Sequence, residues 1–439
     1  MAPTTRPVAP ADLQAAVLQQ TGYAASLFDE LRAGSQAEAG VTRAAYGEGE
    51  EFAHTLVARR AEALGLEVTR DYAANTYMRW PGRDPSAPAV IIGSHLDSVP
   101  QGGNYDGAAG VAAGLVAIAA LKQLGMTPRC DLIVMGVRAE ESIWFRVSYI
   151  GSRSALGSLP AGALEARRVD SQRSLGEHIA DLGGNPAAIR AGARHLNPAQ
   201  VRAFLELHIE QAPSLVAEGR PVAICTGIPG NFRFPEARIT GVQGHVGQPR
   251  RFRRDAAIAA SDFAVALDAV WEEHEAAGTP MAFTLGQFGT DPAQHGLTIV
   301  PGRFDFSLDV RAYDDAVLEG LERKIASIIT QIEQRRGVTF DLGRRTAAEV
   351  GRMDPQLQVA LKEGADELGI PWMPLGSPAS HDAAAFAAAD VPSAMIFVRN
   401  RNGSHNPDEA MEISDFLAGA AVLTSWLASN ACMREEPRD

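Results

Sequence analysis

The residues best suited to chemistry follow an apolar run at 89–92 that predicts a buried strand. An Ala/Val/Leu-rich run at 108–121 comes after them and predicts a helix. His95, Asp97 and Asp106 would therefore lie at the carboxyl end of a strand and in its following loop, where open α/β sheets bind ligands. A histidine nitrogen and two carboxylates are a ligand composition for a divalent metal. Taken alone, the stretch could equally be a polar loop with a chance histidine.

Two further predicted strands carry groups of the same kind. Residues 130–137 predict a buried strand, and the adjacent pair Glu140 and Glu141 follows it. Neighbouring side chains at a strand end face opposite ways, so one carboxylate could bind a metal while the other works on a water molecule. Residues 203–211 alternate apolar and polar types as a strand does, which puts His208 on one face with two glutamates. Glutamate pairs are also common on solvated surfaces, so neither segment decides the chemistry alone.

Composition limits the class of protein. A chain of 439 residues with 46% apolar and 21% charged residues predicts two globular domains, or one domain with a large insertion. A net charge of −13 disfavours nucleic acids and anionic membranes as partners. Three scattered cysteines suit a reducing compartment. The N-terminal stretch does not look like a signal peptide, and no run of about 18 apolar residues occurs, so we expect a cytoplasmic protein.

The outer parts of the chain predict a large α/β domain with a central mixed sheet. Helical and strand patterns alternate along both parts. The further predicted helices are 13–31, 47–64, 171–182, 354–369 and 413–428, and the further strands are 66–70, 77–80, 221–226 and 391–398.

The middle of the chain has a different order of elements. Strands and helices follow as β-α-β-β-α-β, which is the order of a ferredoxin-like α+β domain that folds by itself. The predicted strands are 234–240, 281–288, 303–311 and 338–342, and the predicted helices are 255–277 and 315–336. We therefore expect a domain of residues 1–227 and 344–439, interrupted by a second domain at 228–343.

In their order, these blocks resemble the M20 metallohydrolase family. The resemblance is closest to its hydantoinase/carbamoylase branch, which holds N-carbamoyl-L-amino acid hydrolases, bacterial β-ureidopropionases and allantoate amidohydrolases. The matching motifs are GSHLDSVPQGGNYD at 93–106, EE at 140–141, GSR at 151–153, LELHIEQ at 205–211, GH at 244–245, DVR at 309–311, HD at 381–382 and SHNP at 404–407. The matches span nearly the whole chain, from about Arg43 to Glu412.

The resemblance implies a catalytic domain with two divalent metal ions per subunit: Zn, Mn, Co or Ni. Asp106 would bridge the ions, His95 and His208 would complete the ligands of one, and Glu141 and His405 those of the other. Two divalent ions outweigh two carboxylates in charge, which lowers the pKa of a bound water and polarises a carbonyl oxygen. The mixed histidine and carboxylate set does not choose among the four metals.

The resemblance also assigns the catalytic roles. Asp97 would orient His95, and Glu140 would act as general base and then as general acid. His245, in the inserted lid and dimerisation domain, would stabilise the developing oxyanion, commonly in the site of the partner subunit. His245 could instead be a dimer-interface residue only. We also expect a homodimer through the lid domain, because the sheet of a ferredoxin-like domain can pair edge to edge or its helices can pack across a two-fold axis.

Substrate contacts are the least specific part of the resemblance. Arg311 would bind the carboxylate of a small-molecule substrate, and Gln211 would contact the carboxylate or the carbamoyl group. Arg311 could equally be a surface arginine of the lid, and Gln211 could hold a metal ligand in place. His381 is either a substrate contact or a structural residue.

Three positions depart from the family pattern, and all lie near the expected substrate. Trp144 replaces an arginine after the glutamate pair, Thr298 replaces an asparagine, and the segment 245–251 is one residue short. An indole in place of a cation favours substrates with a bulky apolar or aromatic part. The alternative is that Trp144 packs beneath the loop as core.

The sequence thus predicts a binuclear amidohydrolase that cleaves a C–N bond of an N-carbamoyl or N-acyl amino acid, or of a ureido acid. One alternative is an aminoacylase or peptidase of the same family, with the same metals and a different side-chain pocket. The other is a metal-free binding protein on this fold, which the complete ligand set argues against.

Overall fold

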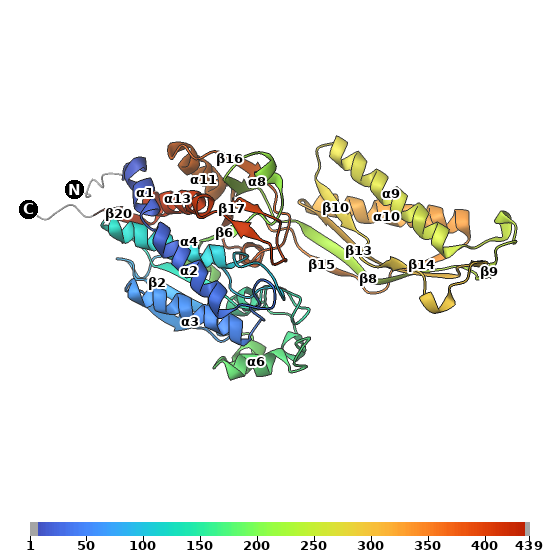
Figure 1. Cartoon of the computed structure of the whole chain (residues 1–439), viewed down its shortest axis with the longest axis horizontal. Helices are drawn as coiled ribbons and strands as arrows, with labels where there is room; N and C mark the ends of the chain where they lie inside the picture. Colours follow the sequence, from blue (N-terminus) through green and yellow to red (C-terminus); the bar gives the residue numbers. More distant parts are fainter. Residues whose placement is uncertain (1–7, 435–439) are drawn as a thin grey trace, which may run out of the picture. The chain divides into compact units, whose positions relative to one another are not determined.

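The computed structural model describes residues 8–434, and none of the helices in that range is long and apolar enough to cross a membrane. The chain divides into two compact units (Figure 1). The larger unit comprises the chain up to Ile228 and from Arg352 onward, and the smaller comprises Pro229–Gly351. The smaller unit continues beyond the expected boundary at 343 because β15 (Thr346–Ala348) pairs with its long strand β8 (Gly230–Thr240).

The larger unit is built on an eight-stranded mixed sheet, as predicted. Its order is β1 (Glu67–Arg70), β2 (Thr76–Trp80), β5 (Leu132–Val137), β3 (Ala89–His95), β6 (Val201–Ile209), β17 (Ser393–Val398), β7 (Val222–Cys225) and β16 (Trp372–Leu375). The four central strands β5, β3, β6 and β17 are parallel to one another, whereas the outer neighbours β2 and β7 are antiparallel to them. The carboxyl ends of the four central strands therefore meet at one edge, where the loops with the polar motifs begin.

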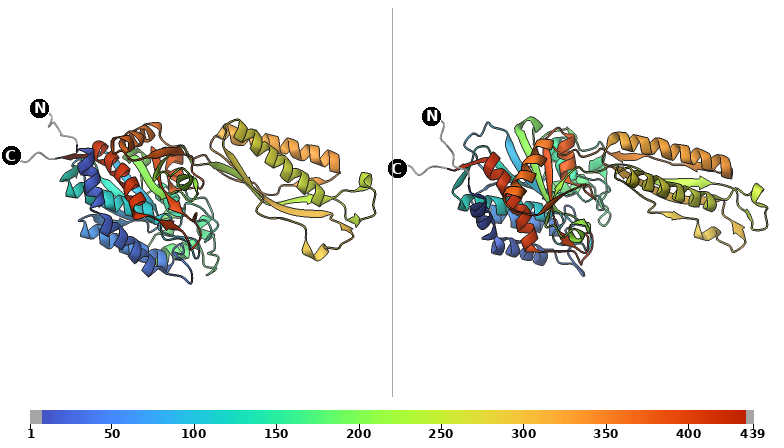
Figure 2. Two further views of the ribbon diagram at one scale, coloured as in Figure 1. Left: turned by 45° about the horizontal axis from the view of Figure 1, so that its top comes forward. Right: turned by 90° about the horizontal axis from the view of Figure 1, so that it is seen from above.

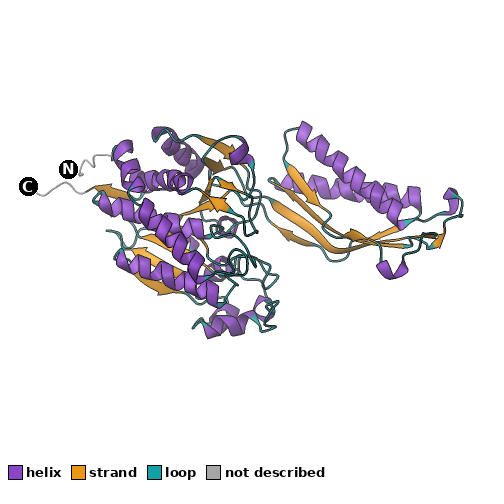
Figure 3. Cartoon of the chain, viewed as in Figure 1, coloured by secondary structure: helices purple, strands orange, loops and turns teal. Residues whose placement is uncertain are grey.

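Helices cover both faces of this sheet (Figure 3). Helix α4 (Ala108–Gln123) is buried almost throughout, because its small residues allow close approach. A Cβ at Gly110 would lie 2.5 Å from the carbonyl oxygen of Leu207 on β6. On the opposite face the rings of Phe204 and Phe386 stack 3.8 Å apart. The helices that share the core with α4 are α1 (Pro10–Leu18), α2 (Thr21–Gly34), α3 (Glu48–Ala63), α11 (Pro355–Glu367) and α13 (Ile413–Asn430).

Short elements complete the larger unit. The helices α5 (Ile150–Leu156) and α12 (Asp382–Ala388) pack together beneath the opposite face of the sheet. The other short helices are α6 (Leu175–Asp181), α7 (Pro186–Arg190) and α8 (Ser214–Ala217). Two small sheets have two strands each: β4 (Met126–Pro128) pairs with β20 (Cys432–Arg434), and β18 (Asn400–Arg401) pairs with β19 (Ala410–Met411).

Two predicted helices differ from the structure. The expected helix 13–31 is two helices, α1 and α2, and at their junction the Thr21 hydroxyl donates to the Leu18 carbonyl over 2.6 Å. The expected helix 171–182 begins only at Leu175. Ser174 and Glu177 form a capping box there, which satisfies two backbone N–H groups at the helix start.

The smaller unit is ferredoxin-like, as predicted. Its sheet order β10 (Met281–Thr284), β13 (Arg303–Ala312), β8, β14 (Thr339–Asp341) is antiparallel throughout. Helices α9 (Ala256–Ala276) and α10 (Asp315–Arg336) lie side by side on one face (Figure 2). The expected strand 281–288 is interrupted, and its end is the separate strand β11 (Phe288–Gly289). A two-stranded ribbon of β9 (Gly244–His245) and β12 (Ile299–Val300) extends from the unit.

Candidate metal centre

The carboxyl ends of β3 and β6 bring two histidines together. The Nε2 atoms of His95 and His208 lie 3.5 Å apart, and they lie 3.3 and 3.2 Å from Oδ1 of Asp106. All three side chains are buried. That Oδ1 atom has no hydrogen-bond partner among the described residues. Because an unpaired buried carboxylate oxygen is costly, its position between two histidine nitrogens fits a divalent cation.

The second nitrogen of each imidazole fixes the tautomer. Nδ1 of His208 lies 2.8 Å from the carbonyl oxygen of Ile209, and Nδ1 of His95 lies 3.1 Å from the carbonyl oxygen of Asp97. A carbonyl only accepts, so Nδ1 carries the proton in both rings and Nε2 is the atom with the lone pair. In His208 this lone pair accepts the backbone N–H of Gly107 over 3.1 Å, so a metal would have to displace that hydrogen bond. Burial lowers the pKa of His95, but the carboxylates of Asp106 and Asp97 raise it by more than burial lowers it. The pKa of His95 therefore lies well above its usual value. This negative field favours any cation at the site.

A second set of ligands shares Asp106. Nε2 of His405 lies 3.1 Å from Oε1 of Glu141 and 3.5 Å from Oδ2 of Asp106. His405 follows β18 and has a left-handed backbone, with φ of 60°. The potential ligand atoms of each set lie within 4.8 Å of one another. The two oxygens of Asp106 face different sets, which is the arrangement that a carboxylate bridging two ions would need.

Asp97 holds the glutamate pair in place. Its two carboxylate oxygens accept the backbone N–H groups of Glu140 and Glu141 over 3.0 and 3.1 Å. One of these oxygens also lies 3.4 Å from Nδ1 of His95. Asp97 therefore orients His95 and also the turn that carries Glu141. The sequence led us to expect only the first of these contacts.

Glu140 belongs to neither ligand set, and its side chain is buried. Burial is the main reason why its pKa lies well above the usual value, and the negative charges of Glu141, Asp382 and Asp97 add to that effect. His95 opposes the shift. A carboxyl group with these surroundings is a suitable acceptor and donor of protons.

The side chain of Gln211 contacts Asp106, a member of both candidate ligand sets. Its Nε2 donates to Oδ2 of Asp106 over 2.7 Å, while its Oε1 is buried without a hydrogen-bond partner among residues 8–434. Its backbone is left-handed, with φ of 65°, and its N–H donates to Oδ1 of Asn400. Gln211 thus orients the carboxylate of Asp106, and its side-chain carbonyl oxygen can accept a further hydrogen bond.

Two residues expected to contact substrate are packing residues in the structure. The Trp144 ring is buried among Tyr46, Phe145 and their neighbours, and its Nε1 donates to the Ser98 carbonyl over 2.8 Å. The expected preference for bulky apolar substrates therefore loses its structural basis. His381 is fully buried 4.4 Å from the ring of His208, and burial lowers its pKa well below the usual value. It is therefore a neutral ring packed against the candidate ligand His208.

The remaining predicted residues belong to the smaller unit and lie at its two ends. Arg311 stands near the end of β13, opposite Asn231 in the register, and its guanidinium pairs with Asp309 at 3.1 Å. His245 pairs with Ile299 in the ribbon, next to the exposed Thr298. The register places Arg303, at the other end of β13, opposite the last residue of β8 before the ribbon. The structure therefore does not bring Arg311 together with His245 and Thr298 within the unit.

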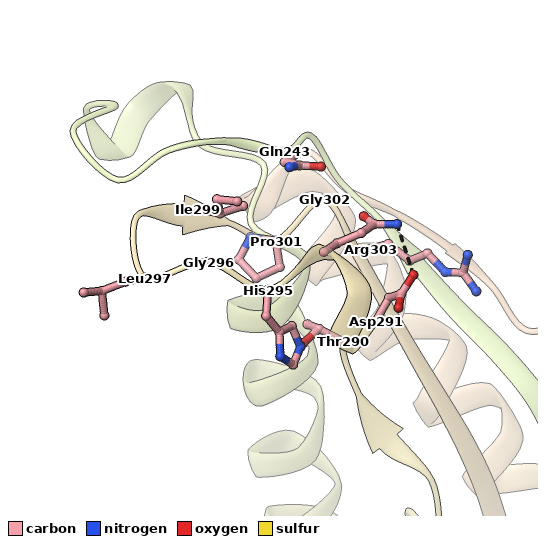
Figure 4. A pocket seen from close by; sticks show the side chains of 11 residues that line it. Gln243, Thr290, Asp291, His295, Gly296, Leu297, Ile299, Pro301, Gly302 and Arg303 are labelled. Carbon is pink, nitrogen blue, oxygen red and sulfur yellow. Dashed lines mark hydrogen bonds between the residues drawn. The ribbon is translucent and has the colours of Figure 1, made fainter.

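A hollow lies beside the ribbon (Figure 4). It has a volume of about 350 Å³, and Gln243, His295, Leu297, Ile299 and Arg303 are among the residues that line it. The Thr290 hydroxyl and His295 Nε2 lie 2.6 Å apart. This hollow contains none of the predicted metal ligands.

Two supporting residues had no clear signal in the sequence. Arg43 is fully buried and donates to the carbonyl oxygens of Leu96 and Asn104, which fixes the loop before Asp106. Glu409 accepts the backbone N–H of Asp106 from the other side. Its position shortly after the Ser-His-Asn-Pro motif was the available hint, but its contact with a loop about 300 residues earlier is tertiary.

Comparison with known proteins identifies the family of the chain. Residues 91–429 match the peptidase family M20/M25/M40. The chain belongs to this family. An N-carbamoyl-L-amino acid amidohydrolase of Geobacillus stearothermophilus is 36% identical over 404 residues, which are 90% of this chain and 94% of that protein. An allantoate amidohydrolase of Bacillus subtilis is 29% identical, over 90% of this chain and 93% of that protein.

The solved structures of this family share the fold. The crystal structure of a hydantoinase/carbamoylase family amidase from Burkholderia multivorans has a TM-score of 0.84 at 29% identity. The similarity covers 94% of this chain and 98% of that one. The family resemblance and the two-part fold expected from the sequence are thus confirmed, and the chain is a hydrolase of the M20 family.

Proposed function

We propose that this M20 family member is a binuclear metal-dependent amidohydrolase. It hydrolyses a linear C–N bond of an N-carbamoyl or N-acyl amino acid, or of a ureido acid. The observation that carries the proposal is the carboxylate of Asp106. Its two oxygens face two different ligand sets, and the Oδ1 oxygen has no hydrogen-bond partner among the described residues. His95 and His208 would hold one ion, and Glu141 and His405 the other.

The donor set fits borderline divalent ions. Imidazole nitrogens and carboxylate oxygens together suit Zn, Mn, Co or Ni. Bound ions of this kind would polarise the scissile carbonyl and make the attacking water more acidic. The residues of the chain then have to position that water and transfer its proton.

Glu140 is the residue for proton transfer. Its backbone N–H is held by Asp97, so the side chain starts from a fixed point, and burial keeps bulk water from competing for its proton. Its carboxylate takes a proton from the attacking water and returns it to the leaving nitrogen, because an amide or ureido nitrogen leaves poorly without protonation. Asp97 keeps His95 in the tautomer that presents Nε2 to the metal.

The substrate would carry a carboxylate. Arg311 offers a guanidinium suited to bidentate binding, and Gln211 offers the unpaired Oε1 beside Asp106. His245 and Thr298 supply polar groups from the ribbon of the smaller unit, and His245 stabilises the oxyanion. The proposal includes a homodimer through the smaller unit and action in the cytoplasm, in keeping with three free cysteines among the described residues.

A substrate panel tests the proposal. The metal-stripped protein is reloaded with Mn²⁺ or Zn²⁺ and assayed on N-carbamoyl amino acids, allantoate, N-acyl amino acids and dipeptides. The expected result is hydrolysis of an N-carbamoyl or ureido compound at the highest kcat/KM. Highest activity on dipeptides would identify a peptidase of the same family. Absence of both bound metal and hydrolysis would identify a binding protein.

A further inference from the structure

A buried glutamate outside the ligand sets contacts the loop that carries Asp106. Glu409 precedes β19, and its Oε1 accepts the backbone N–H groups of Tyr105 and Asp106 over 2.8 and 3.3 Å. Its other oxygen, Oε2, accepts the hydroxyl of Ser404 over 2.7 Å. The two oxygens therefore connect the loop after β3 with the turn after β18.

The fit around Glu409 is close. A Cβ at Gly103 would lie 2.0 Å from Cδ of Glu409, so a glycine is needed where the loop passes this carboxylate. On the same loop, Arg43 donates its Nη2 to the carbonyl oxygen of Asn104 and its Nη1 to Oδ1 of that residue. The guanidinium of Arg43 thus holds the carbonyl groups of Asn104, and the carboxyl group of Glu409 holds the next two backbone N–H groups.

Ser404 links this arrangement to two of the three candidate ligands of the second set. Its hydroxyl lies within hydrogen-bond distance of Glu409 Oε2 and of Asp106 Oδ2, and the next residue is His405. One hydroxyl has one proton and two acceptors here. It can therefore donate to Glu409 when Asp106 Oδ2 binds a cation, without losing a hydrogen bond.

We propose that Glu409, acting through Ser404, is a positioning residue that fixes Asp106 and His405 relative to each other and so sets the affinity of the second metal position. The proposal rests on the binuclear centre proposed above. It assigns no proton transfer and no substrate contact to Glu409. Residues that orient metal ligands typically change metal affinity by about 10- to 100-fold when they are replaced.

The test is a metal titration of three proteins. Glu409→Gln keeps the shape but replaces one acceptor oxygen with a donor, and Glu412→Gln is the matched control, because Glu412 pairs on the surface with Arg401. Mn²⁺ binding to the chelator-stripped proteins is followed by calorimetry. We expect Glu409→Gln to weaken one of the two binding steps by about 10- to 100-fold and the other step by less, because Asp106 belongs to both ligand sets. The control should match wild type.

Ser404→Ala and Ser404→Thr keep the test decisive if Glu409→Gln folds poorly. Ser404→Ala should weaken the same step while the melting temperature of the metal-free protein stays near wild type, and Ser404→Thr, which keeps a hydroxyl, should restore the affinity. Equal weakening of both steps, or unchanged isotherms in Glu409→Gln and Ser404→Ala, would overturn the proposal. A wild-type protein that binds no metal would instead refute the proposed function itself.

Discussion

Gln211 donates its side-chain amide to Oδ2 of Asp106 over 2.7 Å, whereas Oδ1 of the same carboxylate has no donor among the described residues. The histidines of the two sets also differ in their exposure to solvent. The side chains of His95 and His208 are 2% and 0% exposed, whereas that of His405 is 51% exposed. The set of His95 and His208 is thus buried, and the Asp106 oxygen that faces it accepts no hydrogen bond from the described residues. The set of His405 is more exposed, and the Asp106 oxygen that faces it already accepts the amide of Gln211.

This difference predicts two metal-binding steps of unequal affinity. The set of His95, His208 and Asp106 should bind first, since its ligands are preorganised and shielded from water. In a Mn²⁺ titration, His405→Ala should lose only the weaker step, and His208→Ala should lose the tighter one. Two equal sites in wild type, or loss of the tighter step in His405→Ala, would contradict this order.

Substitutions of Glu140 and Glu141 should have different effects, the first on turnover and the second on bound metal. Glu140→Gln cannot accept a proton, so kcat should fall by at least about 10²-fold while the bound metal stays near the wild-type amount. Glu141→Gln is the matched neighbour and should lose metal, because Glu141 faces His405 in the second set. Metal content by elemental analysis and kcat are measured on the same samples. Normal turnover in Glu140→Gln would exclude it as the general base.

Arg311 should act in substrate binding. Arg311→Lys loses the bidentate geometry, so KM for a carboxylate substrate should rise about 10-fold or more with little change in kcat. Arg303→Lys is the control, because Arg303 lies at the other end of β13 and pairs with Asp305 much as Arg311 pairs with Asp309. Equal effects of the two substitutions on KM would show that Arg311 has no specific contact with substrate.

Trp144 should matter for stability and not for specificity. Trp144→Phe removes the donor to the Ser98 carbonyl, which should lower the free energy of unfolding by about 1–3 kcal/mol. Trp372→Phe is the control, since Trp372 donates to the side chain of Asp366 at the surface, and its loss should cost less than about 0.5 kcal/mol. Denaturant unfolding gives both values. A changed ranking of substrates in Trp144→Phe at unchanged stability would return the indole to the pocket.

Much of the centre could be predicted because its residues lie in the last positions of strands or just after them. The apolar runs before His95, Glu140 and His208 are strong local patterns, and parallel neighbouring strands bring their carboxyl ends together without further information. The ferredoxin-like order was equally clear, because two long amphipathic helices alternate with strands.

What could not be predicted depends on tertiary contacts. Trp144 is an aromatic residue in a loop, and only the packing of Tyr46 and Phe145 against it shows that it is core. Arg43 and Glu409 have no motif of their own, and their partners lie 61 and 303 residues away in the chain. Sequence patterns report local periodicity, so buried polar networks of this kind become visible only in the folded chain.

The most direct test of binuclear amide hydrolysis measures bound metal and turnover together during reconstitution. Chelator-stripped protein is titrated with Mn²⁺, and each sample is divided between elemental analysis and an assay on an N-carbamoyl amino acid. We predict no hydrolysis without metal, and activity that reaches its plateau when two ions are bound per chain. Full hydrolysis in metal-free protein, or two bound ions with no hydrolysis of any N-carbamoyl, N-acyl or ureido compound, would contradict the proposed function.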